Sequence, residues 1–240
     1  MRRVLDRRFD VTITTADRME EGQLAHVDLI ILCTTEGAEL DDCEHRELQR
    51  FVHAGGTAIL SAFANWSAHD HYNKRLTDWL GITVTPHAHF CPPATHELTA
   101  ECSKLVSDAE QNPEVDALLS GPWGTVRELR NEGETQFQLA ADGAAGGLVL
   151  GLDPLSQPVL AFFPRLLTPK SSHRTAEQDA PRAGARRQGQ VLVLSNLHCF
   201  ADANAWNGGL WRHDPNQRLL FNLISSALAW SMSQSASVPS

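Results

Sequence analysis

The sequence predicts an α/β protein, a three-layer sandwich in which helices cover both faces of a mainly parallel sheet. Strand-like and helix-like segments alternate over the first 85 residues. The run at residues 28–32 is almost continuously apolar, which is typical of a strand covered on both faces. Helical segments between successive strands imply right-handed crossovers, and these place the strands parallel to one another.

The part of the chain before residue 86 contains the clearest elements. Asp41 and Asp42 place negative charge at the start of a helix, and Gly55 and Gly56 end it. The β-branched residues at 11–15 (VTITT) are typical of a strand. In chain order, the pattern predicts strands at 11–15, 28–32, 57–61 and 82–85, with helices at 41–54 and 72–80.

Residues 86–150 are predicted to form an irregular excursion from the sheet. Pro92 and Pro93 exclude a regular helix around them, so the stretch that contains them is expected to be extended or looped. Periodicity is weak in the rest of this region. The elements predicted there are helices at 96–110 and 113–120, a strand at 137–141 and a turn at 143–147.

The last part of the chain returns to a regular pattern. Strands are predicted at 158–163 and 190–194, and the polar, aperiodic stretch at 168–189 predicts a mobile surface loop. Asp214 as N-cap and Pro215 as the first helical residue begin a final helix, which carries a wide apolar stripe.

These elements predict one α/β domain. The chain opens with the pattern of a helix end before the predicted strand at 11–15, whereas a doubly wound fold normally opens with a strand. We therefore expect a single domain at 1–230 that lacks its first strand, followed by a disordered tail at 231–240.

Composition excludes several classes of function. The 20 Lys and Arg against 29 Asp and Glu give a net charge of −9, which offers no general attraction to nucleic acid or to anionic membranes. No apolar run approaches the roughly 20 residues that a membrane-spanning helix needs. The five cysteines form no C-x-x-C pair, which indicates reduced thiols in a cytoplasmic protein.

Polar side chains follow three of the predicted strands directly. Ligands of open α/β sheets bind beyond the carboxyl ends of the strands, so these side chains predict a crevice for a small molecule or a partner protein. Trp206 lies in a glycine-containing turn at its rim, where an aromatic ring suits a carbohydrate or a protein surface. The candidate binding residues are Thr34, Thr35, Glu36, Phe63, Asn65, Asn196, His198, Asp202 and Trp206.

A cysteine nucleophile would need a neighbouring base to form its thiolate. Cys199 and His198 are adjacent, so in an extended stretch their side chains point to opposite faces. Cys33 and His198 both follow core strands and could meet. A cysteine at the end of an apolar strand is, however, more often a core residue than a nucleophile.

Two histidine clusters carry ligand types suited to zinc. The first is His69-Asp70-His71, and the second is His87-x-His89 with Cys91. No further ligand stands at a recognised spacing from either, and 11 histidines make chance pairs common. We therefore favour structural or surface histidines and expect neither a metal nor a cofactor.

Two motifs resemble class I glutamine amidotransferase-like domains, which have a flavodoxin-like fold. A helix ending in F-V-x-x-G-G leads into the strand Thr57–Ser61, and Ser195, Phe200 and Asp202 stand in the turn before the last helix. The chain is most similar to the non-amidotransferase branches: ThuA-like proteins, gliding-motility ABC-transporter auxiliary proteins and an intraflagellar-transport N-terminal domain. The resemblance covers residues 9–85 and 158–230.

The catalytic residues of that superfamily are missing here. Amidotransferases carry their cysteine directly after the strand matched by Thr57–Ser61, where this chain has Ala62-Phe63-Ala64. The late His-x-Glu pair is absent as well. The resemblance therefore implies a non-catalytic domain that binds a partner protein or small ligand at the crevice. The alternative is a hydrolase or sugar-modifying enzyme that uses Glu36, His198 and Asp202 as acid/base groups.

Overall fold

The described part of the chain carries nine strands and four α-helices. In the computed structural model, the described residues are 5, 8–9, 11–16, 18–32, 40–62, 70–84, 91–98, 113–133, 137–139, 146–153, 156–164, 189–195, 198–200 and 212–235. The strands are β1 Leu29–Ile31, β2 Thr57–Ser61, β3 Ile82–Val84, β4 Cys91–Glu97, β5 Glu128–Gly133, β6 Phe137–Leu139, β7 Leu148–Leu152, β8 Pro158–Phe163 and β9 Gln190–Leu194. The helices are α2 Asp42–His53, α3 Asp70–Leu80, α4 Pro113–Leu119 and α5 Asp214–Ser235, with short 3-10 helices η1 Gln23–His26 and η6 His198–Phe200.

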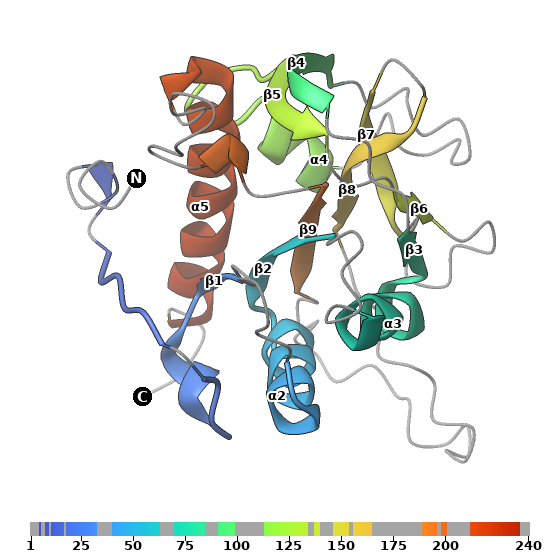
Figure 1. Cartoon of the computed structure of the whole chain (residues 1–240). Coiled ribbons are helices and arrows are strands. Elements are labelled where there is room, and N and C mark those ends of the chain that lie inside the picture. Colours follow the sequence, from blue (N-terminus) through green and yellow to red (C-terminus); the bar gives the residue numbers. More distant parts are fainter. Residues whose placement is uncertain are drawn as a thin grey trace, which may run out of the picture.

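The main sheet has five strands in the order β1-β2-β9-β8-β7 (Figure 1). Strands β1, β2 and β9 run parallel, whereas β9–β8 and β8–β7 are antiparallel pairs. The prediction of an α/β fold is therefore confirmed, and the mainly parallel sheet is corrected to a mixed one. A tight turn explains the difference: Asp153 N donates to Gln157 O at 2.9 Å, so β7 and β8 form a hairpin that needs no crossover helix.

Helices cover both faces of this sheet. Helix α5 lies on one face, and α2 and α3 lie on the other (Figure 1). Side chains of β2 alternate between the two layers: Ile59 packs in the cluster with α5, whereas Ala58 and Leu60 pack in the cluster with α2 and α3. Strand β9 alternates in the same way. The apolar strands are therefore covered on both faces, as their sequence predicts.

Helix α2 begins with a capping box. The side chain of Asp41 accepts hydrogen bonds from the backbone N–H groups of Cys43 and Glu44, and the Glu44 carboxylate accepts one from the Asp41 N–H. These backbone donors hold the pKa of Asp41 below its usual value. At the other end, Gly55 has φ 107°, a conformation that favours glycine. The predicted helix bounds follow from these two signals.

Three predictions in the N-terminal half are wrong in detail. Residues 11–15 are not a strand. Val11 and Ile13 are half-buried against the α5 cluster, so alternation reflects packing of an extended segment rather than sheet pairing. Strand β3 exists, but it pairs antiparallel with β6 in a separate two-stranded sheet. Residues 96–97, expected to begin a helix, belong to β4, which pairs antiparallel with β5.

The remaining elements agree with the predictions within a few residues. Helices α3 and α4 and strands β2, β6, β8 and β9 stand at the predicted places, and η1, β5 and β7 were not predicted. Helix α5 begins at Asp214, so His213 takes the capping position and its carbonyl accepts from the Asn216 N–H at 3.0 Å. The helix continues to Ser235, into the range predicted as a tail. Residues 165–188, which include most of the predicted mobile loop, lie outside the described residues.

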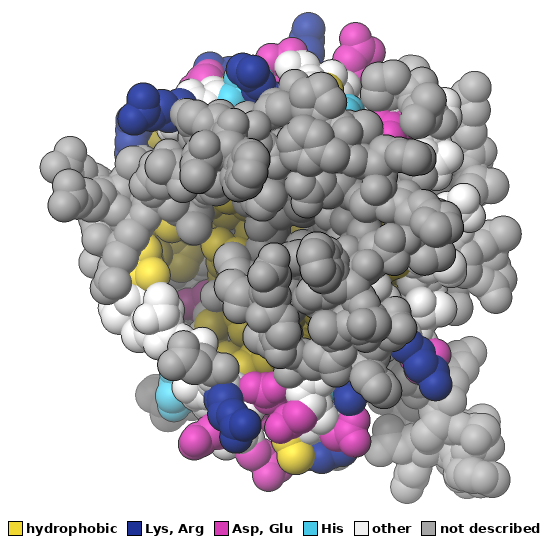
Figure 2. All heavy atoms as spheres, viewed as in Figure 1, with side chains coloured by type: hydrophobic (Ala, Val, Ile, Leu, Met, Phe, Trp, Pro, Cys, Tyr) yellow, Lys and Arg dark blue, Asp and Glu magenta, His cyan; other side chains and the backbone are white. Residues whose placement is uncertain are grey.

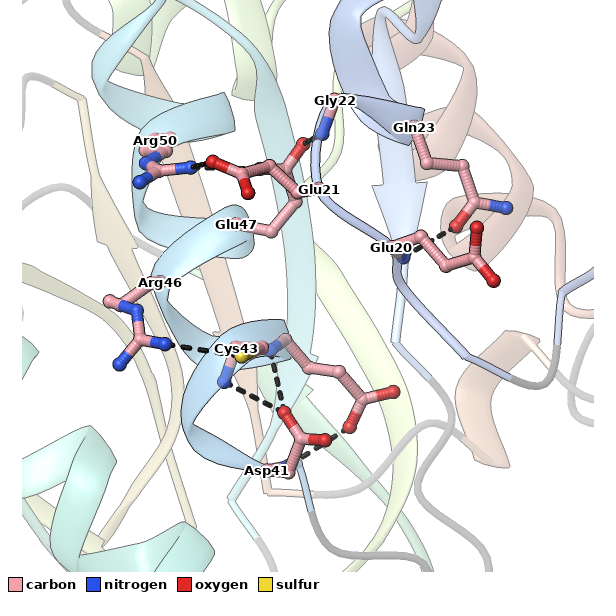
Figure 3. A network of polar contacts seen from close by, with 10 residues as sticks. Glu20, Glu21, Gly22, Gln23, Asp41, Cys43, Arg46, Glu47 and Arg50 are labelled. Carbon is pink, nitrogen blue, oxygen red and sulfur yellow. Dashed lines mark hydrogen bonds and ion pairs between the residues drawn. The ribbon is translucent and has the colours of Figure 1, made fainter.

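Buried glutamates of α2 hold the segment that leads into β1. The backbone N–H of Met19 donates to the Glu44 carboxylate at 3.1 Å, and that of Gly22 donates to Glu47 at 2.9 Å. One turn further on, the Arg50 guanidinium donates to Glu21 at 2.6 Å (Figure 3). Positions i, i+3 and i+6 of a helix lie along one face, so these side chains meet the segment in register. We name this set Glu44, Glu47 and Arg50 the α2 clamp.

Candidate functional site

The parallel strands β1, β2 and β9 all end at the same edge of the sheet. Leu32 N donates to Ile59 O at 2.9 Å just past β1, and Ala62 N donates to Leu194 O at 2.8 Å just past β2. Because the three strands are adjacent and parallel, the chain leaves all of them at this edge. The segments that carry the predicted crevice residues therefore start from neighbouring positions.

The side chains predicted to line the crevice lie outside the described residues. Their role stays a prediction, and so does the acid/base role of three of them. Residue His198 opens η6, but its side chain is also outside the described set. The residues concerned are Thr34, Thr35, Glu36, Phe63, Asn65, Asn196, His198, Asp202 and Trp206.

The two candidate metal clusters lie outside the described side chains as well, which leaves both untested. They are His69, Asp70 and His71, and His87, His89 and Cys91. Within the residues that the structure describes, no three His, Cys, Asp or Glu side chains gather as a metal site would require.

Two of the five thiols are described. Cys199 is completely buried, and burial raises the pKa of its thiol well above the usual range. A thiol in that state is protonated at neutral pH and is a poor nucleophile. Cys43 is exposed at the start of α2, where Arg46 donates to its Sγ at 3.1 Å.

Figure 2 shows acidic and basic side chains interspersed over α2, at the bottom of the view.

Behind the sheet edge, neutral polar side chains are completely buried. The amide of Asn131, on β5, donates to the hydroxyl of Ser195 at 3.1 Å, directly after β9. At the end of β2, the strand next to β9, the backbone oxygen of Ser61 accepts a hydrogen bond from the Tyr72 hydroxyl at 2.9 Å. This contact joins α3 to β2. Burial raises the pKa of Tyr72 well above its usual value, so the hydroxyl keeps its proton. These contacts fix the positions from which the crevice segments start.

Asn216 joins three elements at this edge. Its Oδ1 accepts from Arg130 N at 2.9 Å, and its Nδ2 donates to Arg130 O at 2.8 Å and to Cys199 O at 3.0 Å. The side chain is 0% exposed. One asparagine at the start of α5 thus fixes both β5 and η6 through their backbones.

A second buried asparagine, in the middle of α5, binds α4 and the residues that follow it. Asn222 Nδ2 donates to Leu118 O at 3.0 Å and to Gly124 O at 3.1 Å, and its Oδ1 accepts from Trp123 N at 3.0 Å. The indole of Trp123 packs at 5.1 Å from Phe221, centroid to centroid, and donates to Ser225. We name Asn216 and Asn222 the asparagine hubs.

Neither asparagine is among the residues predicted from the sequence, although a signal is present. Asn216 stands three, four and seven residues before Leu219, Leu220 and Leu223, on the apolar stripe of the predicted helix. A polar side chain on such a stripe is buried, and a buried amide needs hydrogen-bond partners. The stripe was correctly assigned, but its polar members were not considered.

At the outer rim, more exposed polar and charged side chains replace the buried amides. His213 Nε2 lies 3.4 Å from Glu128 Oε1, which links the start of α5 to β5. Arg218 pairs with Asp214 at 2.5 Å, one turn along the helix. The described part of the site is therefore a rigid frame with neutral amides inside and charges outside. Its asparagine hubs are committed to backbone groups of neighbouring elements, and the amide of Asn131 is committed to the hydroxyl of Ser195.

The comparisons with known proteins support the fold and give no family. No protein-family description and no curated protein match the chain. A solved structure described as "mmIFT52 N-terminal domain" is similar, with a TM-score of 0.54 and 14% sequence identity. The match covers 95% of this chain and 88% of that one. At this level of identity, the likeness concerns the fold alone.

None of the described helices combines the length and the apolar character that crossing a membrane requires.

Proposed function

We propose that the chain is a non-catalytic, amidotransferase-like domain that binds a partner protein at the crevice beyond β1, β2 and β9. The observation that carries the proposal is the chemistry of the strand ends. The sequence directly after β2 is Ala62-Phe63-Ala64, without a nucleophile, and the described thiol nearest to β9, Cys199, is buried and protonated.

Two further observations support this function. The fold likeness to an IFT52 N-terminal domain extends over nearly the whole chain, which supports the α/β fold on which a crevice at the strand ends depends. The hydrogen-bonded frame behind the edge also holds β5, η6 and the start of α5 in fixed positions. A rigid frame that presents variable loops is a common basis of specific binding. A small ligand, including a carbohydrate, remains the second occupant that this crevice would suit.

Site-specific photo-crosslinking tests the proposal. A photoreactive residue replaces Asn65 at the predicted crevice, and another replaces Gln138, which is exposed on β6. We expect a discrete cross-linked protein from position 65, none from position 138, and loss of the product when Phe63→Ala and Trp206→Ala are added. Equal labelling from both positions would contradict a crevice site.

The enzymatic alternative has a separate test. Purified protein is assayed against panels of ester, amide and glycoside substrates. Turnover that disappears in His198→Ala, with an unchanged unfolding midpoint, would establish catalysis and overturn the non-catalytic proposal. Absence of turnover in the panel, together with the position-specific cross-link, agrees with a binding domain.

A further inference from the structure

His96 lies on the inner face of the β4–β5 pair. The register sets His96 opposite Leu129 and Ala94 opposite Asn131, and directly opposed residues share a face. His96 is only 4% exposed. Its ring thus lies between the small β4–β5 sheet and the main sheet, on the same face as the amide that reaches Ser195.

The two strands of this pair are attached with unequal strength. Strand β5 is fixed from outside by Asn216, which bonds both the N–H and the C=O of Arg130. Among the described residues, strand β4 pairs with β5 and makes one bridge to β7, between Leu98 and Gly151. Pro92 and Pro93 have no N–H to give to the pairing, and the register is irregular between Cys91 and Ala94.

The imidazole of His96 is buried without the partners that a charged ring needs. Neither ring nitrogen makes a hydrogen bond of normal geometry with the described residues. Burial lowers the pKa of His96. The nearby Asp153 carboxylate and the backbones of Asn131 and Leu152 act in the opposite direction with less weight. A neutral ring is tolerated here, whereas a protonated one is an incompletely paired charge in the interior.

Few other charges face this ring. Glu97 and Glu128 are opposed on the outer face of the pair, as are Thr95 and Arg130. Strand β7 contributes only Asp153, which follows it and whose Oδ1 already accepts from the Gln157 N–H at 2.8 Å. Within the described residues, Asp153 is therefore the one charged group that acts on His96 from the elements packed against it.

We propose that His96 is a proton-sensitive latch: its protonation releases strand β4 from β5 and β7, while β5 stays attached to α5 through Asn216. The folded chain favours the neutral ring, so stability from the latch is complete above about pH 6.5, the usual histidine value. It is lost as the pH falls below that value and through the lower pKa of the folded state. This inference does not depend on the proposed function.

Amide hydrogen exchange resolves the latch from general unfolding. The Leu98 N–H, which donates to Arg127 O at 2.8 Å, reports on β4, and the Arg130 N–H reports on β5. Protection factors, corrected for intrinsic rates, are measured by NMR at about pH 7.5 and about pH 5.5. We expect Leu98 to lose protection by up to about tenfold between these pH values, the limit set by the one unit between pH 5.5 and the usual histidine pKa of about 6.5. Arg130 should keep its protection.

Variants identify the responsible ring. His96→Gln and His96→Leu remove the titration, and their Leu98 protection should no longer depend on pH. The matched control is His53→Gln on α2, whose pKa is also lowered by burial but which lies on the other face of the sheet. This variant should keep the pH response of Leu98.

Three results would overturn the latch. One is Leu98 protection in the wild-type chain that does not change between the two pH values. Another is an equal loss at Arg130 and at Val193 in β9, because that pattern is global unfolding. If neither His96 variant folds, an NMR titration of the His96 ring in the wild-type chain tests the proposal instead. A midpoint at or above the usual value rejects the proposal, and a lower one that coincides with release of Leu98 supports it.

Discussion

Two peripheral regions are fixed to the body of this protein by opposite chemistry. The α2 clamp holds residues 19–23 with carboxylates and a guanidinium, and its outer ion pair is largely exposed. The asparagine hubs hold α4, β5 and η6 with neutral amides that are 0% exposed. Both regions bond mainly to backbone groups, so each fixes a segment whatever side chains that segment carries.

The comparison shows where sensitivity to conditions is expected. A charged contact at the surface weakens with salt, whereas a buried neutral amide responds to neither salt nor pH. Breaking the amide is the costlier event, because its partners are then left without hydrogen bonds in the interior. The predictions below test this contrast.

The largest effect is expected for Asn216→Ala. The substitution leaves the N–H and C=O of Arg130 and the C=O of Cys199 without their partner. Each buried unpaired group costs about 1–3 kcal/mol, so we expect a loss of about 4 kcal/mol in the free energy of unfolding by urea. Gln138→Ala, at an exposed position, is the control and should change stability by less than about 0.5 kcal/mol. A loss of similar size in both variants would refute the hub.

An intermediate effect is expected when a methyl group is added beside a hub. A Cβ at Gly121 would clash with Ala117 O and stand 2.6 Å from Asn222 Oδ1, so Gly121→Ala should cost about 2–3 kcal/mol. Gly22, in the segment held by the α2 clamp, has φ 79° and open space around it. Gly22→Ala should therefore cost only the backbone strain, about 1 kcal/mol. Thermal unfolding of the two variants checks this order, and the reverse order would contradict it.

The smallest effect is expected at the surface of the clamp. Arg50 and Glu21 are 60% and 82% exposed, so Arg50→Met should shift the urea midpoint less than either glycine variant does. The remaining shift should vanish in about 1 M salt, where the Debye length is about 3 Å. A shift that persists at high salt would show that Arg50 contributes by packing rather than by charge.

The local sequence pattern predicts those helices and strands whose sequence signals lie within their own residues. Helix α2 has its capping residues and its terminal glycines, and the apolar runs of β2 and β9 require burial on both faces. Elements defined by their partners were missed. Strand β4 contains Pro92 and Pro93 and exists because β5 pairs with it, whereas residues 11–15 have strand composition but no place in the sheet.

The candidate site, too, could be predicted from the sequence only in part. Its location at the ends of β1, β2 and β9 follows from the general rule for parallel strands, and the topology places those ends together. The hubs could not be derived by that rule, because their partners are backbone groups far away in the sequence, such as Arg130 for Asn216. Which amide a buried asparagine bonds is decided by tertiary packing and not by the local pattern.

The mixed sheet has a consequence for the order of assembly. Strand β9 is the junction: it pairs parallel with β2, from the N-terminal part, and antiparallel with its late neighbour β8. The β7–β8 hairpin can close from local contacts as soon as it is synthesised, whereas β2 must wait for β9 to leave the ribosome. Until then the apolar residues of β1 and β2 have no completed sheet, so they are exposed to aggregation during this interval of translation.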